Sequence, residues 1–188
     1  MGWLMWCYQL VCLQLVLLHS PSFANLCSHG QSSALLQFKQ HYSFVKSDSD
    51  DDSCHTQLHF PKMYSEEDTD CCSWDRVTCD MVTGHVIALN LSCSWLYGVI
   101  PSNSSLSLLS HLQKFNLAYN DFNLSKIPSD FVILPSLTHL NLSSSNFFGQ
   151  VQYEIFRLPK LISLDLYDDL TLETPFGLTL KHFIFTLH

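Results

Sequence analysis

Residues 86–101 read VIALNLSCSWLYGVIP, and residues 140–151 read LNLSSSNFFGQV. Each stretch contains a Leu-x-Leu pair, and both leucines of such a pair point to one side of an extended backbone. A short polar run follows, and then a glycine, Gly98 or Gly149, at which the chain must turn tightly. The pattern therefore predicts a short strand that buries one face and is followed by a turn and a return segment.

The same pattern recurs along residues 86–188. Its phase is marked by four leucines that are 26, 25 and 24 residues apart, namely Leu91, Leu117, Leu142 and Leu166. Periods of roughly 20–29 residues are typical of leucine-rich repeats. One unit cannot bury its apolar face alone, so neighbouring units stack and share a core. We therefore predict an α/β leucine-rich-repeat solenoid, with three full repeats and a partial fourth over 86–188.

The predicted strands form a short parallel β-sheet on the concave face of the solenoid. The pairs Ile100-Pro101 and Ile127-Pro128 belong to a G-x-I-P type of return, which favours irregular or 3₁₀ segments on the convex side. Asn120 occupies the position where an asparagine side chain satisfies the backbone of the adjacent turn. Shorter or charged polar residues replace it in the other units: Ser94, Ser145 and Asp169.

The first 24 residues read as a signal peptide. Residues 1–18 are almost continuously apolar, and Ser22 and Ala24 are small residues placed for cleavage after Ala24. The alternative is an uncleaved signal anchor, because the apolar run is about the minimum that spans a bilayer. Pro21 and the small-residue site favour cleavage, so we expect a secreted product, unanchored as written.

Charge and cysteine content narrow the class of protein. Lys and Arg number 9 against 17 Asp and Glu, which gives a net charge of −8 and argues against nucleic acid or an anionic membrane surface as partner. The chain has eight cysteines, two of them within the secretory leader, and this content indicates an oxidising compartment. An even set, which fits a disulfide framework, remains after cleavage: Cys27, Cys54, Cys71, Cys72, Cys79 and Cys93.

Residues 25–85 differ from the repeats and are predicted to form a cysteine-bearing N-terminal cap. A helix is expected over residues 32–45, with Ser32 as its N-cap. The acidic run at 47–53 lacks the glycine and distal glutamate of a calcium-binding loop and is interpreted as solvated. His55 and His59 have i, i+4 spacing beside Cys54, but without a second cluster this is a weak zinc signal, and no metal site is predicted.

The cap also carries a family resemblance. CCSWDRVTC at 71–79, followed by TGHVIALNLS at 83–92, resembles the plant N-terminal cap pattern CC-x-W-x-G-V-x-C, and SSALLQFK at 32–39 is typical of the same cap. With the phased repeats, essentially the whole chain resembles plant leucine-rich-repeat receptor-like proteins of the disease-resistance type. Arg76 stands where the pattern has glycine, so either the turn relaxes or a non-glycine residue is strained.

The resemblance implies disulfide pairs and a plug for the solenoid. It implies the pairs Cys27–Cys71 and Cys72–Cys79, which leaves Cys54 to pair with Cys93 unless both are free thiols. Trp74, inside the short disulfide loop, is expected to cover the open end of the first repeat. Family members usually carry many more repeats, a C-terminal cap, a membrane helix and a cytoplasmic tail, so the chain resembles an N-terminal fragment. We expect its last unit to be uncapped, with the edge at Leu164 and Leu166 left open.

Four sequons predict glycan acceptors at Asn90, Asn103, Asn123 and Asn141, although such tripeptides also arise by chance in Asn/Ser-rich repeats. Asn90 and Asn141 lie between paired leucines and should face outward from the concave sheet, whereas the other two lie on return loops. A ligand-binding face would use the outward strand positions, which mix polar and aromatic residues. These are Lys114, Asn116, Tyr119, His139, Asn141, Ser143, Ser163, Asp165 and Tyr167.

No catalytic site or cofactor is predicted, because the chain has no G-x-S-x-G, phosphate-binding glycine loop or H-E-x-x-H. The resemblance implies an innate-immunity receptor module that perceives an extracellular protein, peptide or microbial product. Such proteins signal through leucine-rich-repeat co-receptor kinases at the plasma membrane. The alternatives are a secreted inhibitor similar to plant polygalacturonase inhibitors, or a non-functional truncated product.

Overall fold

The computed structural model describes residues 27–45, 54, 70–101, 105–167, 172–173 and 184–186. The predicted signal peptide lies outside these residues, as do His55, His59, Asn103 and Asp169. The helical elements are α2 (His29–Gln40), η2 (Cys71–Ser73), η3 (Ser105–Leu108), η4 (Ser129–Ile133) and η5 (Tyr153–Arg157), of which only α2 is α-helical. The strands are β1 (Ser43–Phe44), β2 (Val77–Cys79), β3 (Val86–Asn90), β4 (Leu96–Tyr97), β5 (Lys114–Asn116), β6 (His139–Asn141), β7 (Gly149–Gln150), β8 (Ser163–Asp165), β9 (Leu172–Glu173) and β10 (Ile184–Thr186).

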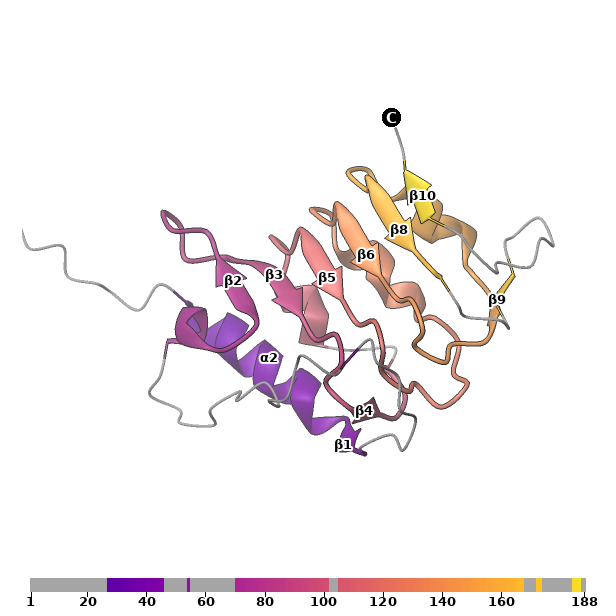
Figure 1. Ribbon diagram of the computed structural model, residues 1–188. Coiled ribbons are helices and arrows are strands. Elements are labelled where there is room, and N and C mark those ends of the chain that lie inside the picture. Colours follow the sequence, from indigo (N-terminus) through magenta and orange to yellow (C-terminus); the bar gives the residue numbers. More distant parts are fainter. Residues whose placement is uncertain are drawn as a thin grey trace, which may run out of the picture.

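One six-stranded sheet runs through the whole repeat stack, in the order β10-β8-β6-β5-β3-β2 (Figure 1). Its four central strands, β3, β5, β6 and β8, pair in parallel, one from each repeat. The registers align Leu89, Phe115, Leu140 and Leu164 in one buried row. The predicted solenoid with a parallel sheet is therefore confirmed, and Phe115 takes a leucine position without breaking the row.

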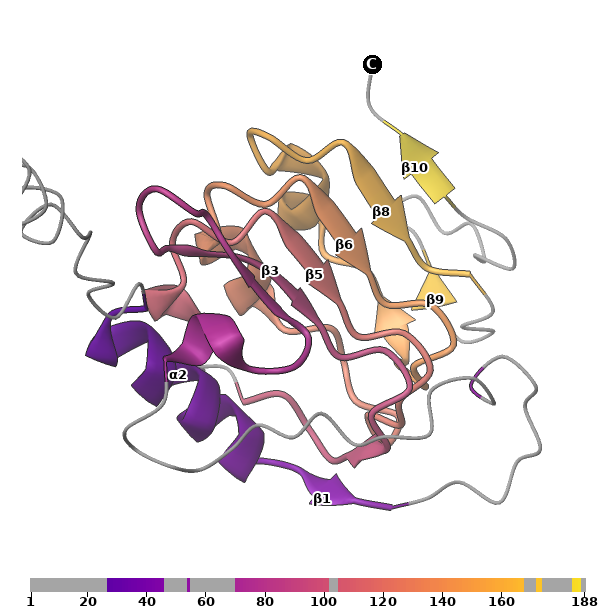
Figure 2. The same ribbon diagram turned by 60° about the vertical axis from the view of Figure 1, so that its left-hand side comes forward.

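The return segments lie behind the sheet, and where the structure describes them their helical turns are short 3₁₀ turns (Figure 2). Each of η3, η4 and η5 precedes the next repeat strand, and Leu106, Phe131 and Ile155 anchor them in the core. Further along each repeat, β7 and β9 pair in parallel as a second, two-stranded sheet. The predicted 3₁₀ convex side is thus confirmed.

The two predicted turn glycines have backbone angles that suit only glycine. Gly98 has φ 142° and Gly149 has φ 88°. At Gly98 an added Cβ would lie 3.5 Å from the backbone oxygen of His41, which is an ordinary contact distance, so the requirement for glycine comes from the backbone angle of the turn.

The N-terminal cap begins with α2, which starts earlier than the sequence suggested. Its N-cap is Ser28, whose Oγ accepts the backbone N–H of Gln31 at 3.4 Å, so the expectation that Ser32 is the N-cap was wrong. Ser32 lies in the first turn and its hydroxyl donates to the His29 carbonyl. The helix ends at Gln40, because Ser43 and Phe44 extend as β1 and pair antiparallel with β4.

Aromatic packing joins the cap to the repeats. Phe38 of α2 lies edge-on to Phe115 of β5, with ring centroids 6.0 Å apart. Tyr42 packs against both Phe38 and Phe122, at 5.1 and 5.9 Å. Trp74 is 3% exposed and belongs to the same hydrophobic core. The cap and the repeats therefore share one core.

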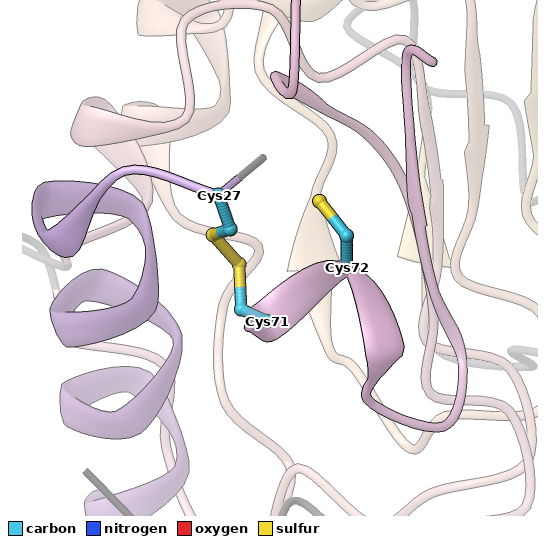
Figure 3. Close-up of side chains that lie close together, drawn as sticks. All are labelled: Cys27, Cys71 and Cys72. Atoms are coloured by element: carbon cyan, nitrogen blue, oxygen red, sulfur yellow. A yellow bond between two sulfur atoms is a disulfide. The ribbon is translucent and has the colours of Figure 1, made fainter. Parts of the chain in front are cut away.

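Three disulfides hold the cap, in the pairs Cys27–Cys71, Cys72–Cys79 and Cys54–Cys93. Figure 3 shows Cys27 bonded to Cys71 while the neighbouring Cys72 carries its sulfur apart from that bond. The sulfur atoms of these three residues lie within 4.8 Å of one another, a spacing that could suit a metal ion. Metal binding requires free thiolates, and all three sulfurs are used in disulfides, so this cluster is a structural one.

Arg76 stands at the glycine position of the cap pattern with φ 67°, in the left-handed region. Of the two alternatives, the structure shows the strained residue. Its Nη1 donates to the Ser92 carbonyl and lies 3.4 Å from the Ser94 hydroxyl, while its own carbonyl accepts the Asn90 N–H at 3.0 Å. Partial burial lowers the pKa of the guanidinium, and the nearby Asp75 acts in the opposite direction. These bonds hold the strained turn against the first repeat.

The far edge of the sheet is covered, contrary to the expectation of an open edge. β10 pairs antiparallel with β8, with Phe185 opposite Leu164 (Figure 1). Leu164 and Leu166 both have 0% exposure. At the other end, β2 pairs antiparallel with β3. An antiparallel strand therefore closes each end of the parallel sheet and satisfies backbone groups that an edge strand would expose.

Asn120 lies at the position where the sequence predicted an asparagine that bonds to the backbone of the adjacent turn. Its side chain bonds to the preceding repeat and to its own repeat. Its Oδ1 accepts the backbone N–H groups of Ser94 and Leu96 at 3.2 and 3.0 Å. Its Nδ2 donates to the carbonyls of Leu91 and Leu117 at 2.9 and 2.7 Å. Nδ2 also lies 3.3 Å from the Ala118 carbonyl, so one buried amide satisfies several buried backbone groups.

Candidate recognition surface

The concave face of the sheet carries two rows of outward side chains, which follow from the strand register. The first row, called the Lys114 row, contains Ala88, Lys114, His139 and Ser163. The second, called the Asx row, contains Asn90, Asn116, Asn141 and Asp165. All eight side chains line one shallow hollow of about 320 Å³. Side-chain alternation along each strand sends these residues away from the core and the leucines into it.

Every member of the Asx row makes the same local hydrogen bond. Each Oδ1 accepts the backbone N–H of the residue two positions further on, which fixes the turn after the strand. The oxygen–nitrogen distances are 3.2 Å for Asn90, 3.0 Å for Asn116 and Asn141, and 3.1 Å for Asp165. The row is therefore rigid, and each amide or carboxylate has one oriented group left facing the hollow.

The ring of His139 is oriented by a neighbouring hydroxyl. Thr138 Oγ1 lies 2.8 Å from the carbonyl of Gln113 and 2.9 Å from His139 Nδ1. The same carbonyl also accepts the backbone N–H groups of Thr138 and His139, so the hydroxyl is held beside the ring at a fixed point. Because Nδ1 is engaged by this hydroxyl, Nε2 is the ring nitrogen of His139 that remains for a ligand.

The structure brings six of the nine predicted ligand-facing residues to this hollow: Lys114, Asn116, His139, Asn141, Ser163 and Asp165. Ser143 is a correction. It is only 5% exposed, and its hydroxyl donates to Asn141 Oδ1 at 2.6 Å, because it lies in the turn after the strand rather than on it. Tyr119 and Tyr167 lie beyond the strand ends, half-buried and exposed respectively, and do not line the hollow.

Sequence reasoning missed Ala88 as a lining residue, and it placed Asn90 on the concave face without including it among the ligand-facing residues. Both occupy the outward positions of the first repeat strand, opposite Lys114 and Asn116 in the register. The signal was present, because the Leu89-Asn90-Leu91 triplet has the same phase as Leu140-Asn141-Leu142.

The described sequons fall on two different surfaces. Asn90 and Asn141 lie on the concave face as expected, so a glycan on Asn141 would stand over the hollow. Asn123 lies outside the sheet, with an exposed side chain and φ 54°, and its backbone N–H donates to Asp121 Oδ1 at 2.8 Å. Asn123 is therefore the described sequon that is presented clear of the hollow.

A second hollow, of about 530 Å³, lies at the N-terminal ends of β3, β5 and β6. The rings of His85 and His111 stack in it, 3.8 Å apart and nearly parallel. The carboxylate of Asp80 accepts from the Thr83 hydroxyl and from two backbone N–H groups, which hold its pKa below the usual range. Because these bonds are internal to one turn, Asp80 supports the hairpin rather than the hollow.

Comparison with known proteins identifies the class of protein. No family model matches the chain. The chain is 42% identical over 165 residues to receptor-like protein 6 of Arabidopsis thaliana, and the match covers 81% of the chain and 17% of that protein. It is 40% identical over 173 residues to receptor-like protein Cf-9 of Solanum pimpinellifolium, which covers 89% of the chain and 19% of that protein. The chain thus spans under a fifth of the length of these relatives.

Among solved structures, a chain of the Arabidopsis receptor kinase HAESA complex with the peptide hormone IDA and the co-receptor SERK1 is similar, with a TM-score of 0.58 at 26% identity. That match covers 76% of this chain and 21% of the other. The stacked repeats, disulfide cap and concave face define a leucine-rich-repeat solenoid of the kind found in plant receptor ectodomains. By sequence, the chain is similar to the plant receptor-like proteins over 81–89% of its own length. Within the part that the structure describes, no helix is long and apolar enough to cross a membrane.

Proposed function

We propose that this chain is an extracellular recognition module of a plant immune receptor-like protein, which binds a protein, peptide or microbial ligand on its concave face. The observation that carries the proposal is the single hollow over four repeat strands, lined by two aligned rows of polar side chains. Such a surface is rigid and polar, and it joins residues from separate repeats, as protein-recognition faces do.

The relatives support the same function. They are receptor-like proteins, and the similar solved structure contains a peptide hormone and a co-receptor kinase. For this chain we propose a peptide or protein ligand and, as signalling partner, a leucine-rich-repeat co-receptor kinase. No nucleic acid, cofactor or catalytic step is part of the proposal.

The proposed site of action is the extracellular side of the secretory pathway, which predicts a glycan on Asn123. Expressed in leaves with its own leader, the chain should appear in apoplastic fluid and lose mass after glycosidase treatment. Asn123→Gln should remove one glycan from the mass spectrum, because the exposed side chain is open to the transferase. Material retained inside the cell, with Asn123 unmodified, would contradict both the localisation and the modification.

Recognition by the concave face is tested by site-directed photo-crosslinking. A photoreactive phenylalanine at Ser163, in the hollow, should capture peptides from the apoplastic fluid of infected leaves. The matched control places the same group at Tyr153, an exposed residue of η5 on the convex side. A captured peptide, identified by mass spectrometry and resynthesised, should bind the unmodified chain in calorimetry.

We expect Lys114→Ala with His139→Ala to weaken that binding at least about tenfold, which corresponds to about 1.4 kcal/mol. Tyr153→Ala should leave it unchanged. Equal crosslinking from Ser163 and Tyr153, or a peptide that binds all variants alike, would refute recognition by this face.

A further inference from the structure

We propose that the concave hollow binds an extended peptide segment that places a carboxylate side chain over Lys114 and a basic side chain against Asp165. This inference rests on the proposed recognition function and names the chemistry of its ligand. It follows from which polar atoms of the hollow are already bonded within the protein and which are left for a ligand.

The asparagines of the Asx row present donors to the hollow. The Oδ1 atoms of Asn90, Asn116 and Asn141 already accept backbone N–H groups, which fixes the orientation of each amide. Their Nδ2 groups make no hydrogen bond among the described residues, and each carries two N–H donors. Three of the four positions in this row therefore offer hydrogen-bond donors, which favours a ligand rich in acceptors.

The Lys114 row adds a positive charge beside those donors. Lys114 lies between Ala88 and His139 in the register, and its side chain is exposed. No carboxylate pairs with it among the residues that the structure describes, and the opposite charge at Asp165 lies two strands away. A ligand that covers Lys114 removes water from the ammonium group, which is costly unless the ligand supplies a counter-charge. A carboxylate satisfies both the ammonium and the neighbouring amides.

The β8 end of the hollow has the opposite polarity. One carboxylate oxygen of Asp165 accepts the Tyr167 N–H, and the second is left for a ligand. His139 Nε2, the ring nitrogen not engaged by Thr138, is a second polar atom left for the ligand beside it. This end therefore favours a cation and N–H donors, and the hollow carries a charge gradient from β5 to β8.

The strand geometry sets the spacing of the two ligand charges. Neighbouring strands are about 4.8 Å apart, so β5 and β8 are separated by about 10 Å across the sheet. Asp165 lies two positions further along its strand than the partner of Lys114, which adds about 7 Å along the strand direction. The diagonal is about 12 Å, and an extended chain advances about 3.3 Å per residue. The acidic and basic residues of the ligand should thus be three to four positions apart.

The test uses a capped probe peptide, acetyl-Ser-Glu-Thr-Val-Thr-Lys-Ser-amide, and the full chain made in an oxidising bacterial host that adds no glycans. Binding is measured by calorimetry and by nitrogen–proton NMR shifts. We expect Lys114→Gln and Asp165→Asn each to weaken binding about fivefold, and Lys126→Gln, an exposed lysine on a return segment, to leave it unchanged. A probe with Gln in place of Glu should show the same loss as Lys114→Gln.

Charge reversal provides the stricter measurement. The variant Lys114→Glu should no longer bind the original probe and should bind a probe with Lys in place of Glu. Equal affinity of the chain, Lys114→Gln and Lys126→Gln for the probe would overturn the inference, as would a glycan found on Asn141 of leaf-secreted protein. Crosslinked peptides captured at Ser163 but insensitive to Lys114→Gln would leave the recognition function standing and refute only this ligand chemistry.

Discussion

Replacing Asn120 by alanine is expected to lower the free energy of unfolding by about 3–5 kcal/mol. The amide is 7% exposed and bonds to the N–H groups of Ser94 and Leu96 and to the carbonyls of Leu91 and Leu117. Alanine removes these bonds at once, and the buried N–H groups of Ser94 and Leu96 and the carbonyl of Leu91 lose their side-chain partner, whereas the Leu117 carbonyl keeps the Ser145 hydroxyl. Each orphaned buried backbone group costs about 1–3 kcal/mol. Urea unfolding followed by circular dichroism measures the change.

The chain offers a matched control at Asn116. This asparagine is half-buried, and among the described residues its side chain makes one hydrogen bond, to the Ala118 N–H, so alanine removes the partner of one backbone group instead of several. We expect Asn116→Ala to cost about 1 kcal/mol or less. Asn120→Asp separates the roles of the two ends of the amide, because the carboxylate keeps the acceptor but faces two carbonyls without a donor. Asn120→Asp should lower the free energy of unfolding about as much as Asn120→Ala. An Asn120→Asp variant as stable as Asn116→Ala would contradict the contribution assigned to the buried amide.

Ser94 and Ser145, which take the place of Asn120 in the neighbouring repeats, show what could be predicted from the sequence. Ser145 is a shorter substitute, as expected, and its one hydroxyl proton is directed to the carbonyls of Leu117 and Ser143, at 2.8 and 3.0 Å. Ser94 differs, because the Arg76 guanidinium lies beside its hydroxyl. The position and burial of both serines follow from the repeat period alone. The hydrogen-bond partner of Ser94 depends on the strained turn at Arg76, which no local propensity predicts.

The ends of the sheet were harder to predict than its middle. Leucine phase defines which residues of the central strands are buried, because one period repeats through all of them. β2 and β10 do not follow the repeat period, and their antiparallel pairing depends on chain segments folding back onto β3 and β8.

The predicted start of the helix was wrong for a local reason, since Ser28 and Ser32 are both competent N-caps. The Cys27–Cys71 bond sits beside Ser28, a constraint that helix periodicity does not contain.

The lining of the concave hollow was predicted at the level of the face but not of its chemistry. Alternation within Leu-x-Leu identifies outward residues such as Asn116 and Asn141. The sequence does not show that their Oδ1 atoms are used by the turn while Nδ2 is left, since that depends on the backbone after each strand. It also could not separate Ser143, two positions further on, which the same turn buries.

Removing the Cys27–Cys71 disulfide as Cys27→Ala with Cys71→Ala should cost about 4 kcal/mol, whereas Cys72→Ala with Cys79→Ala should cost about 2.5 kcal/mol. The first bond closes a loop with a sequence separation of 44 and the second a separation of 7. A longer loop restricts more conformations of the unfolded chain, so its loss releases more entropy. Alanine is preferred to serine because Cys71 is fully buried, and a hydroxyl there would need a partner.

The native contacts around the two bonds should preserve this order. Asp70 Oδ1 accepts the backbone N–H groups of Cys27 and Cys72 at 3.0 and 3.1 Å, so α2 and η2 stay linked through a carboxylate when either disulfide is absent. The folded state is then similar in both double variants, and the difference between them reports the unfolded chain. Urea unfolding of both variants at equal ionic strength measures it. Equal losses would show that the Cys27–Cys71 bond acts through native packing at the start of α2 rather than through loop length. A larger loss for the Cys72–Cys79 pair would place the stabilisation in the turn that carries Trp74 and Arg76, where the cap meets the first repeat.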